Sequence, residues 1–81
     1  MKNTYIPLNQ VTIGKTCIVK NLKSSGIKRR RILDLGFIPN TKIKVIRRSP
    51  LGDPTAYLIR ETMIALRKEE ASKILVKVIN N

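Results

Sequence analysis

The sequence predicts a mostly β fold, a small and strongly bent antiparallel sheet of about five strands with one inserted α-helix at about residues 25–36. The chain has 81 residues, which suits a single domain over residues 1–81. Apolar and polar residues alternate in several short runs, and residues that favour turns separate these runs. Only one segment changes to a helical period. Because a sheet of this size removes its exposed edges most economically by closing on itself, we expect a small barrel.

The first quarter of the chain predicts a turn followed by a strand. Residues 7–14, PLNQVTIG, have the pattern of a single helical turn that stops at Gly14. Residues 15–22, KTCIVKNL, alternate as a strand does, with Cys17 and Val19 on one side. We therefore expect Cys17 to be a small core residue rather than a reactive thiol.

The inserted helix follows in SSGIKRRRILDLGF, residues 24–37. Ser24 or Ser25 can cap its start, and Gly36 can end it in the left-handed conformation. The basic residues 28–31 are expected on its outer surface and flanks. Its apolar side is expected to carry Ile27, Ile32, Leu33 and Leu35.

The remaining segments predict the other strands. Pro39 and Asn40 suit the two central positions of a type II turn, because Asn tolerates a positive φ. A strand then directs Ile43 and Val45 towards the core. Two more strands, TAYLIR and MIALRK, are expected to join in a hairpin at Glu61–Thr62. One helical turn, KEEASK, and a last strand, ILVKVI, complete the chain. An SH3-like barrel is the preferred topology, and an OB-like barrel is the alternative.

The loop PLGDP at residues 50–54 is the strongest local signal. A phosphate-binding loop needs converging backbone amides and a following helix, whereas this loop has two prolines, one glycine, the acidic Asp53 and a strand after it. A phosphate site is therefore excluded. Asp53 is expected to hold the turn. Leu51 is expected either to close the open end of the barrel or to act as a docking residue.

The side chains that carry most enzyme chemistry are scarce. The chain has no histidine, one cysteine and five scattered carboxylates, and no spacing resembles a set of metal ligands. We therefore expect no enzyme activity, no cofactor, no metal site and no small-molecule substrate. A single cysteine, polar first residues and the lack of a long apolar segment predict a cytoplasmic protein.

The formal net charge of +12 predicts an anionic partner. Three partners fit this charge: nucleic acid, the inner face of a membrane, or an acidic protein surface. Single-strand and RNA binding usually adds aromatic residues between the basic ones, and no basic run here contains one. Nucleic acid is therefore disfavoured, although a small basic nucleic-acid-binding barrel stays the alternative.

Three motifs occur in order along the chain: RILDLG at residues 31–36, SPLGDP at 49–54 and ALRKEEA at 65–71. Together with the opening segment PLNQVTIGKTCIV they resemble the FeoA family, small cytosolic proteins of bacterial ferrous iron transport. The resemblance spans nearly the whole chain. In two places the chain departs from the family pattern: Asn40 replaces the glycine of a Pro-Gly-Thr turn, and Glu61 replaces the glycine usual in the late hairpin.

The resemblance implies an SH3-like barrel with an inserted helix and no enzymatic activity. It further implies a non-enzymatic accessory protein that docks on the cytosolic side of a membrane ferrous iron transporter with a GTP-binding domain and modulates it. The charge of the chain would favour a peripheral contact with the anionic inner face of the cell membrane. The candidate docking residues are Arg29, Arg30, Arg31, Leu51 and Asp53. For the arginines, a merely solvated helix face is the competing interpretation.

Overall fold

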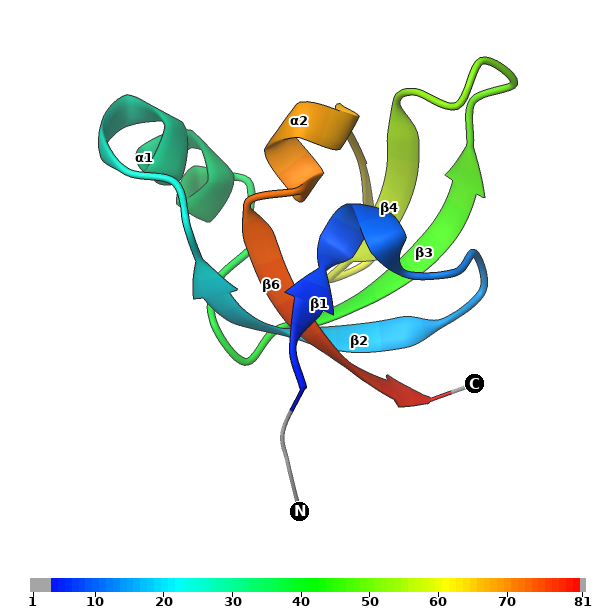
Figure 1. The fold of residues 1–81 in the computed structure, drawn as a ribbon, viewed down its shortest axis with the longest axis horizontal. Helices are drawn as coiled ribbons and strands as arrows, with labels where there is room; N and C mark the ends of the chain where they lie inside the picture. The colour runs from blue at the N-terminus through cyan, green and yellow to red at the C-terminus, as the bar shows by residue number, and fades with distance from the viewer. Residues whose placement is uncertain (1–3, 81) are drawn as a thin grey trace.

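One antiparallel sheet of six strands forms the body of the protein (Figure 1). The structure is a computed structural model that describes residues 4–80, so residues 1–3 and 81 of the expected domain lie outside the described residues. In chain order the elements are β1 (Ile6–Pro7), the 3₁₀ helix η1 (Leu8–Gln10), β2 (Thr16–Leu22), α1 (Gly26–Asp34), β3 (Lys42–Arg48), β4 (Thr55–Ile59), β5 (Thr62–Leu66), α2 (Lys68–Ala71) and β6 (Ile74–Asn80). The prediction of a mostly β fold with one inserted helix is confirmed, and the very short β1 is the strand that the sequence did not reveal.

The sheet has the strand order β1-β6-β2-β3-β4-β5 and curls around one apolar core. Strand β6 pairs with both β1 and β2, so the first and last strands of the described residues lie side by side in the sheet. The alternation in β2 and β3 is as predicted, because Cys17, Val19, Ile43 and Val45 are fully buried. Within residues 4–80 the core is therefore mainly aliphatic, and Phe37 and Tyr57 are its aromatic members.

The end of α1 is fixed by a Schellman motif. The backbone N–H of Gly36 donates to Leu33 O at 3.0 Å, and that of Phe37 donates to Ile32 O at 3.2 Å. Gly36 has a φ of 109°, so the left-handed stop predicted there is confirmed. The motif turns Phe37 into the core, where its ring meets the ring of Tyr57 edge to face, with centroids 6.4 Å apart.

The remainder of α1 differs from the prediction in three ways. The helix is shorter than residues 25–36, because its last turn is taken up by the motif at Gly36. Ser25 occupies the N-cap position but makes no side-chain cap hydrogen bond. Ile27 was assigned to the apolar side of the helix, and that assignment is wrong: its side chain is 89% exposed. The second turn of α1 reaches the core, where Ile32 is buried and the half-buried Leu33 packs against it.

Two turns depend on residues in the left-handed region. Asn40 has a φ of 76°, which confirms the turn predicted after Pro39. The hairpin between β4 and β5 has Arg60 and Glu61 as its two central residues, so it begins one residue earlier than predicted. Both have a positive φ, 50° and 66°, which is the signature of a type I′ turn. Type I′ turns favour Asn-Gly, so this hairpin carries unfavourable residues in both places.

We expect the substitution of Arg60→Asn together with Glu61→Gly to raise the free energy of unfolding by about 1 kcal/mol or more, because it removes the strain of two left-handed residues. Both side chains are exposed, so no packing is lost. Urea denaturation followed by circular dichroism measures the change. A pair placed on the exposed face of β3, Lys42→Asn and Lys44→Gly, is the control and should destabilise the protein.

No helix within residues 4–80 is long and apolar enough to cross a membrane.

Candidate functional site

Three segments lie together along one side of the barrel: α1, α2 and the loop of residues 49–54 between β3 and β4. Figure 1 shows them side by side along the upper edge of the molecule, with α2 in the middle. We call these three segments the rim. It contains all three motifs quoted above: α1 carries RILD of the first, the loop is the second, and α2 carries KEEA of the third.

The loop of residues 49–54 satisfies its own backbone groups. The N–H of Gly52 donates to Ser49 O at 2.7 Å, and the N–H of Ser49 donates to Pro54 O at 3.0 Å. The N–H of Leu51 points to the Ser49 hydroxyl at 3.4 Å, and the Asp53–Pro54 peptide bond is cis. Because these donors are used within the loop, they do not converge on a phosphate position, in agreement with the sequence.

Leu51 stands at the tip of this loop and is 92% exposed. The interpretation of Leu51 as a lid over the open end of the barrel is therefore wrong, because a lid residue would be buried against the core. The side chain of Ile27 is exposed to a similar degree on α1, which is at the other end of the rim. Two large apolar residues of the rim are thus exposed to solvent.

Asp53 fastens the loop to α2. Its Oδ1 accepts a hydrogen bond of 2.7 Å from the backbone N–H of Lys68, the first residue of that helix. The sequence predicted a turn residue in this position, but it did not reveal the contact with a segment 15 residues away.

We expect Asp53→Ala to lower the free energy of unfolding by about 1 kcal/mol, since a helix amide loses its charged acceptor. Asp53→Asn keeps an acceptor oxygen in place and should lose less. Thermal denaturation of the two variants measures the difference. Equal stability of Asp53→Ala and the unsubstituted chain would show that the loop is held by other contacts.

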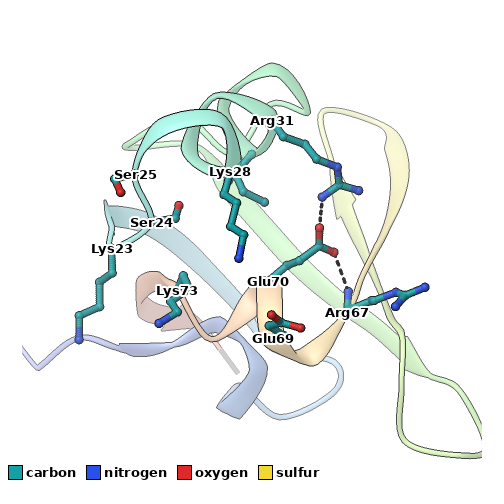
Figure 2. Close-up of a pocket in the computed structure, with 10 residues that line it drawn as sticks. Lys23, Ser24, Ser25, Lys28, Arg31, Arg67, Glu69, Glu70 and Lys73 are labelled. Atoms are coloured by element: carbon teal, nitrogen blue, oxygen red, sulfur yellow. Dashed lines mark hydrogen bonds and ion pairs between the residues drawn. The ribbon is translucent and has the colours of Figure 1, made fainter.

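Glu70 fastens α1 to α2. Its Oε2 pairs with the guanidinium of Arg31, and its Oε1 accepts a hydrogen bond of 3.0 Å from the backbone N–H of Arg67 (Figure 2). The helix α2 is therefore the centre of the rim, since the loop is attached to one end of it and α1 to the other.

The three candidate arginines of α1 have different surroundings. Arg29 donates to the carbonyl oxygen of Leu22 at 3.3 Å, and Arg31 pairs with Glu70. Arg30 is exposed, and its side chain makes no hydrogen bond or ion pair with any residue in the described range 4–80. The basic run is thus divided: Arg29 and Arg31 attach the helix to the body, and Arg30 is available to a partner.

A groove of about 530 Å³ lies between α1 and α2 (Figure 2). Five cationic side chains and two carboxylates line it, together with Ser24, Ser25 and Ile32. The charged residues are Lys23, Lys28, Arg31, Arg67, Lys73, Glu69 and Glu70. The sequence pattern did not predict this groove, because Lys23 and Lys73 come from opposite ends of the chain.

The described residues contain no cluster of three or more side chains that could hold a metal ion. Cys17 lies in the core, on β2, rather than on the rim. Burial raises the pKa of its thiol from 9.0 to about 12, so the thiolate needed for metal binding or nucleophilic attack is scarce at neutral pH.

We expect the stability of the chain to fall as the pH rises from about 9 towards 12, because the unfolded thiol loses its proton in this window while the folded thiol keeps it. The Cys17→Ala variant should show a shallower decline. Burial also raises the pKa of Tyr57, but that residue is present in both proteins and contributes equally. The measurement is the slope of unfolding free energy against pH. Identical slopes for the unsubstituted chain and Cys17→Ala would contradict a raised pKa of the buried thiol.

Comparison with known proteins places the chain among proteins of iron transport. The family model described as the FeoA domain matches residues 6–78. A Fe(2+) transport protein A/Fe(2+) transporter FeoB fusion protein of Porphyromonas gingivalis is 34% identical over 91% of the chain, which spans only 9% of that protein's length. A FeoA-like protein of Clostridium acetobutylicum has a solved structure with a TM-score of 0.89 at 36% identity, covering 100% of this chain and 93% of the other.

A third comparison concerns the fold alone. FeoA of Stenotrophomonas maltophilia, described as a prokaryotic SH3 domain protein, superposes with a TM-score of 0.77 at 22% identity, over 91% of this chain and 89% of the other. The preferred SH3-like topology is thereby confirmed, and the OB-like alternative is wrong.

Proposed function

The chain belongs to the FeoA family of ferrous iron transport proteins, and we propose that it is a non-enzymatic accessory protein that docks through its rim on the cytosolic side of a GTP-binding ferrous iron transporter and modulates it. In this proposal the chain works as a single domain in the cytoplasm. Its task is to bind a protein, not to hold the iron.

One observation carries the choice of partner. In the fusion protein of P. gingivalis, transport protein A and the transporter FeoB form one polypeptide, and this chain is 34% identical to part of it. When two domains are fused in one protein, separate chains that correspond to these domains in another organism commonly bind each other. This supports a transporter of the FeoB kind as the partner of this chain.

The rim supports the choice of surface. Leu51, Ile27 and Arg30 are exposed there and contribute nothing to the core, whereas Asp53 and Glu70 hold the segments that carry them. Exposed apolar side chains on a fixed scaffold are typical of binding surfaces. In our proposal Leu51 and Arg30 touch the transporter, whereas Asp53, Arg29 and Arg31 keep the surface in shape.

The net charge supports the place of binding. A charge of +12 attracts the chain to the anionic inner leaflet and to acidic loops of a membrane protein. We therefore propose a peripheral position at the inner face of the membrane. A nucleic-acid partner is less well supported, since Phe37 and Tyr57 are buried and the exposed Tyr5 lies outside the basic runs.

The experiment is a pull-down from detergent-solubilised membranes at near-physiological salt, with the chain as bait. We expect a large GTP-binding membrane protein to be retained by the unsubstituted chain. The bait with Leu51→Ser and Arg30→Glu should lose it, and a bait with Met63→Ser and Lys42→Glu, matched in kind but outside the rim, should keep it. Recovery of nucleic acid alone would contradict the proposal.

A further inference from the structure

We propose that the groove between α1 and α2 binds an acidic segment of the partner protein, with neighbouring Asp or Glu side chains contacting Lys23, Lys28 and Lys73. This inference rests on the proposed function and names the chemistry of the segment that the rim receives. It concerns a surface separate from the exposed Leu51 at the tip of the loop.

The first support is the charge of the groove. Its five cations and two carboxylates leave a formal excess of three positive charges. Glu70 is already occupied by Arg31 and by the backbone of Arg67, which leaves Glu69 as the one carboxylate opposite the lysines. An anion entering the groove therefore meets more attraction than repulsion.

The second support is the arrangement of the lysines. The backbone N–H of Lys23 donates to Lys73 O at 2.7 Å, so two lining segments that are 50 residues apart in the sequence are joined beside the groove. Figure 2 shows Lys23 and Lys73 towards one end of the groove, Lys28 between them and Glu70, and Arg31 and Arg67 towards the other end. None of these three ammonium groups has a hydrogen-bond or ion-pair partner within residues 4–80.

The third support is a buried polar atom. Ser24 Oγ lines the same groove and is buried without a hydrogen-bond partner among the described residues. Such an atom is costly, since burial removes its bonds to water without replacing them. Rotation of the Ser24 side chain towards the groove would let this hydroxyl donate a hydrogen bond to a carboxylate of a bound segment.

The far end of the groove shows how a carboxylate is bound there. Glu70 reaches in from α2, pairs with a guanidinium through one oxygen and accepts a backbone N–H through the other. The lysine end offers a hydroxyl and three ammonium groups, and no carboxylate within residues 4–80 pairs with these ammonium groups. The carboxylates of an acidic segment would pair with the lysines at that end, as the carboxylate of Glu70 pairs with Arg31 at the other end. A groove of about 530 Å³ has the size of a site for a few side chains.

The test uses the full chain and a synthetic oligo-aspartate peptide as the probe, with titration followed by amide NMR and calorimetry. We expect the largest shifts at residues 23–28 and at residue 73. The variant with Lys28→Glu and Lys73→Glu should raise the dissociation constant by about tenfold or more, and the control with Lys42→Glu and Lys44→Glu, which has the same net charge, by less than about threefold. Lys28→Arg with Lys73→Arg should bind as the unsubstituted chain does.

Several results would contradict the assignment of the groove as a binding site for an acidic segment. If the groove variant and the control lose the same amount of peptide affinity, the attraction is nonspecific. Amide NMR shifts spread over the whole sheet would lead to the same conclusion. Competition with inorganic phosphate or with vesicles of anionic lipid is the second check. If either displaces the peptide from residues 23–28 at equal charge concentration, the groove is a general anion site. Lys28→Gln with Lys73→Gln gives a neutral variant in case charge reversal unfolds the chain.

If the unsubstituted chain retains the transporter while the groove variant binds the peptide normally, only the groove assignment fails. If the peptide binds as expected but no transporter is retained, the proposed function fails instead.

Discussion

The substitution Phe37→Ala is expected to lower the free energy of unfolding by about 3–5 kcal/mol. Phe37 has no exposed surface, follows the glycine that ends α1 and packs edge to face on Tyr57. The truncation therefore leaves a cavity at the point where the helix joins the sheet. A small domain has little stability to spare, so most of it would be lost.

Urea denaturation followed by far-ultraviolet circular dichroism measures this loss. Phe37→Leu keeps most of the volume and is the control, with an expected loss of about 1–2 kcal/mol. A loss below about 1 kcal/mol for Phe37→Ala would mean that the core closes around the gap. The contact between helix and sheet would then be less important than the structure indicates.

The second large effect is expected on binding. Leu51→Ser with Arg30→Glu should weaken binding to the transporter about tenfold or more, because it removes an exposed apolar side chain and reverses an unpaired charge on the rim. Stability should change by less than about 0.5 kcal/mol, since neither side chain packs on the core. Binding of the purified chain to the transporter in detergent, measured by calorimetry, gives the affinity.

The matched control for this pair is Met63→Ser with Lys42→Glu, which changes the same kinds of side chain on β5 and β3. We expect its affinity to stay within about threefold of the unsubstituted chain. If both pairs weaken binding equally, overall charge governs the interaction and the rim does not.

The strands could be predicted from the sequence because alternation alone determines which side chains face the core. Ile43 and Val45 are buried and their lysine neighbours are exposed, as the pattern requires. Turns could also be predicted where a residue type favours the left-handed conformation, as Gly36 and Asn40 do. The hairpin at Arg60–Glu61 was displaced by one residue because neither residue favours a turn.

The parts that the sequence did not reveal depend on contacts between distant segments. Asp53 meets Lys68 across 15 residues and Arg31 meets Glu70 across 39, and no local pattern predicts either pair. Ile27 was assigned to the core because of its apolar side chain, yet the first turn of α1 extends beyond the sheet. The structure brings the three motifs together along the rim, with α2 in the middle, so motifs that are separate in the sequence form one surface.

The coupling of this chain to ferrous iron transport through the rim is our main proposal. Its most direct test is uptake of radiolabelled ferrous iron by iron-limited cells that lack the chain and carry no other copy of it. We predict slow uptake, restored by the unsubstituted chain and by the Met63→Ser, Lys42→Glu control but not by Leu51→Ser with Arg30→Glu at equal protein level. Full restoration by the rim variant, or normal uptake without the chain, would contradict the account.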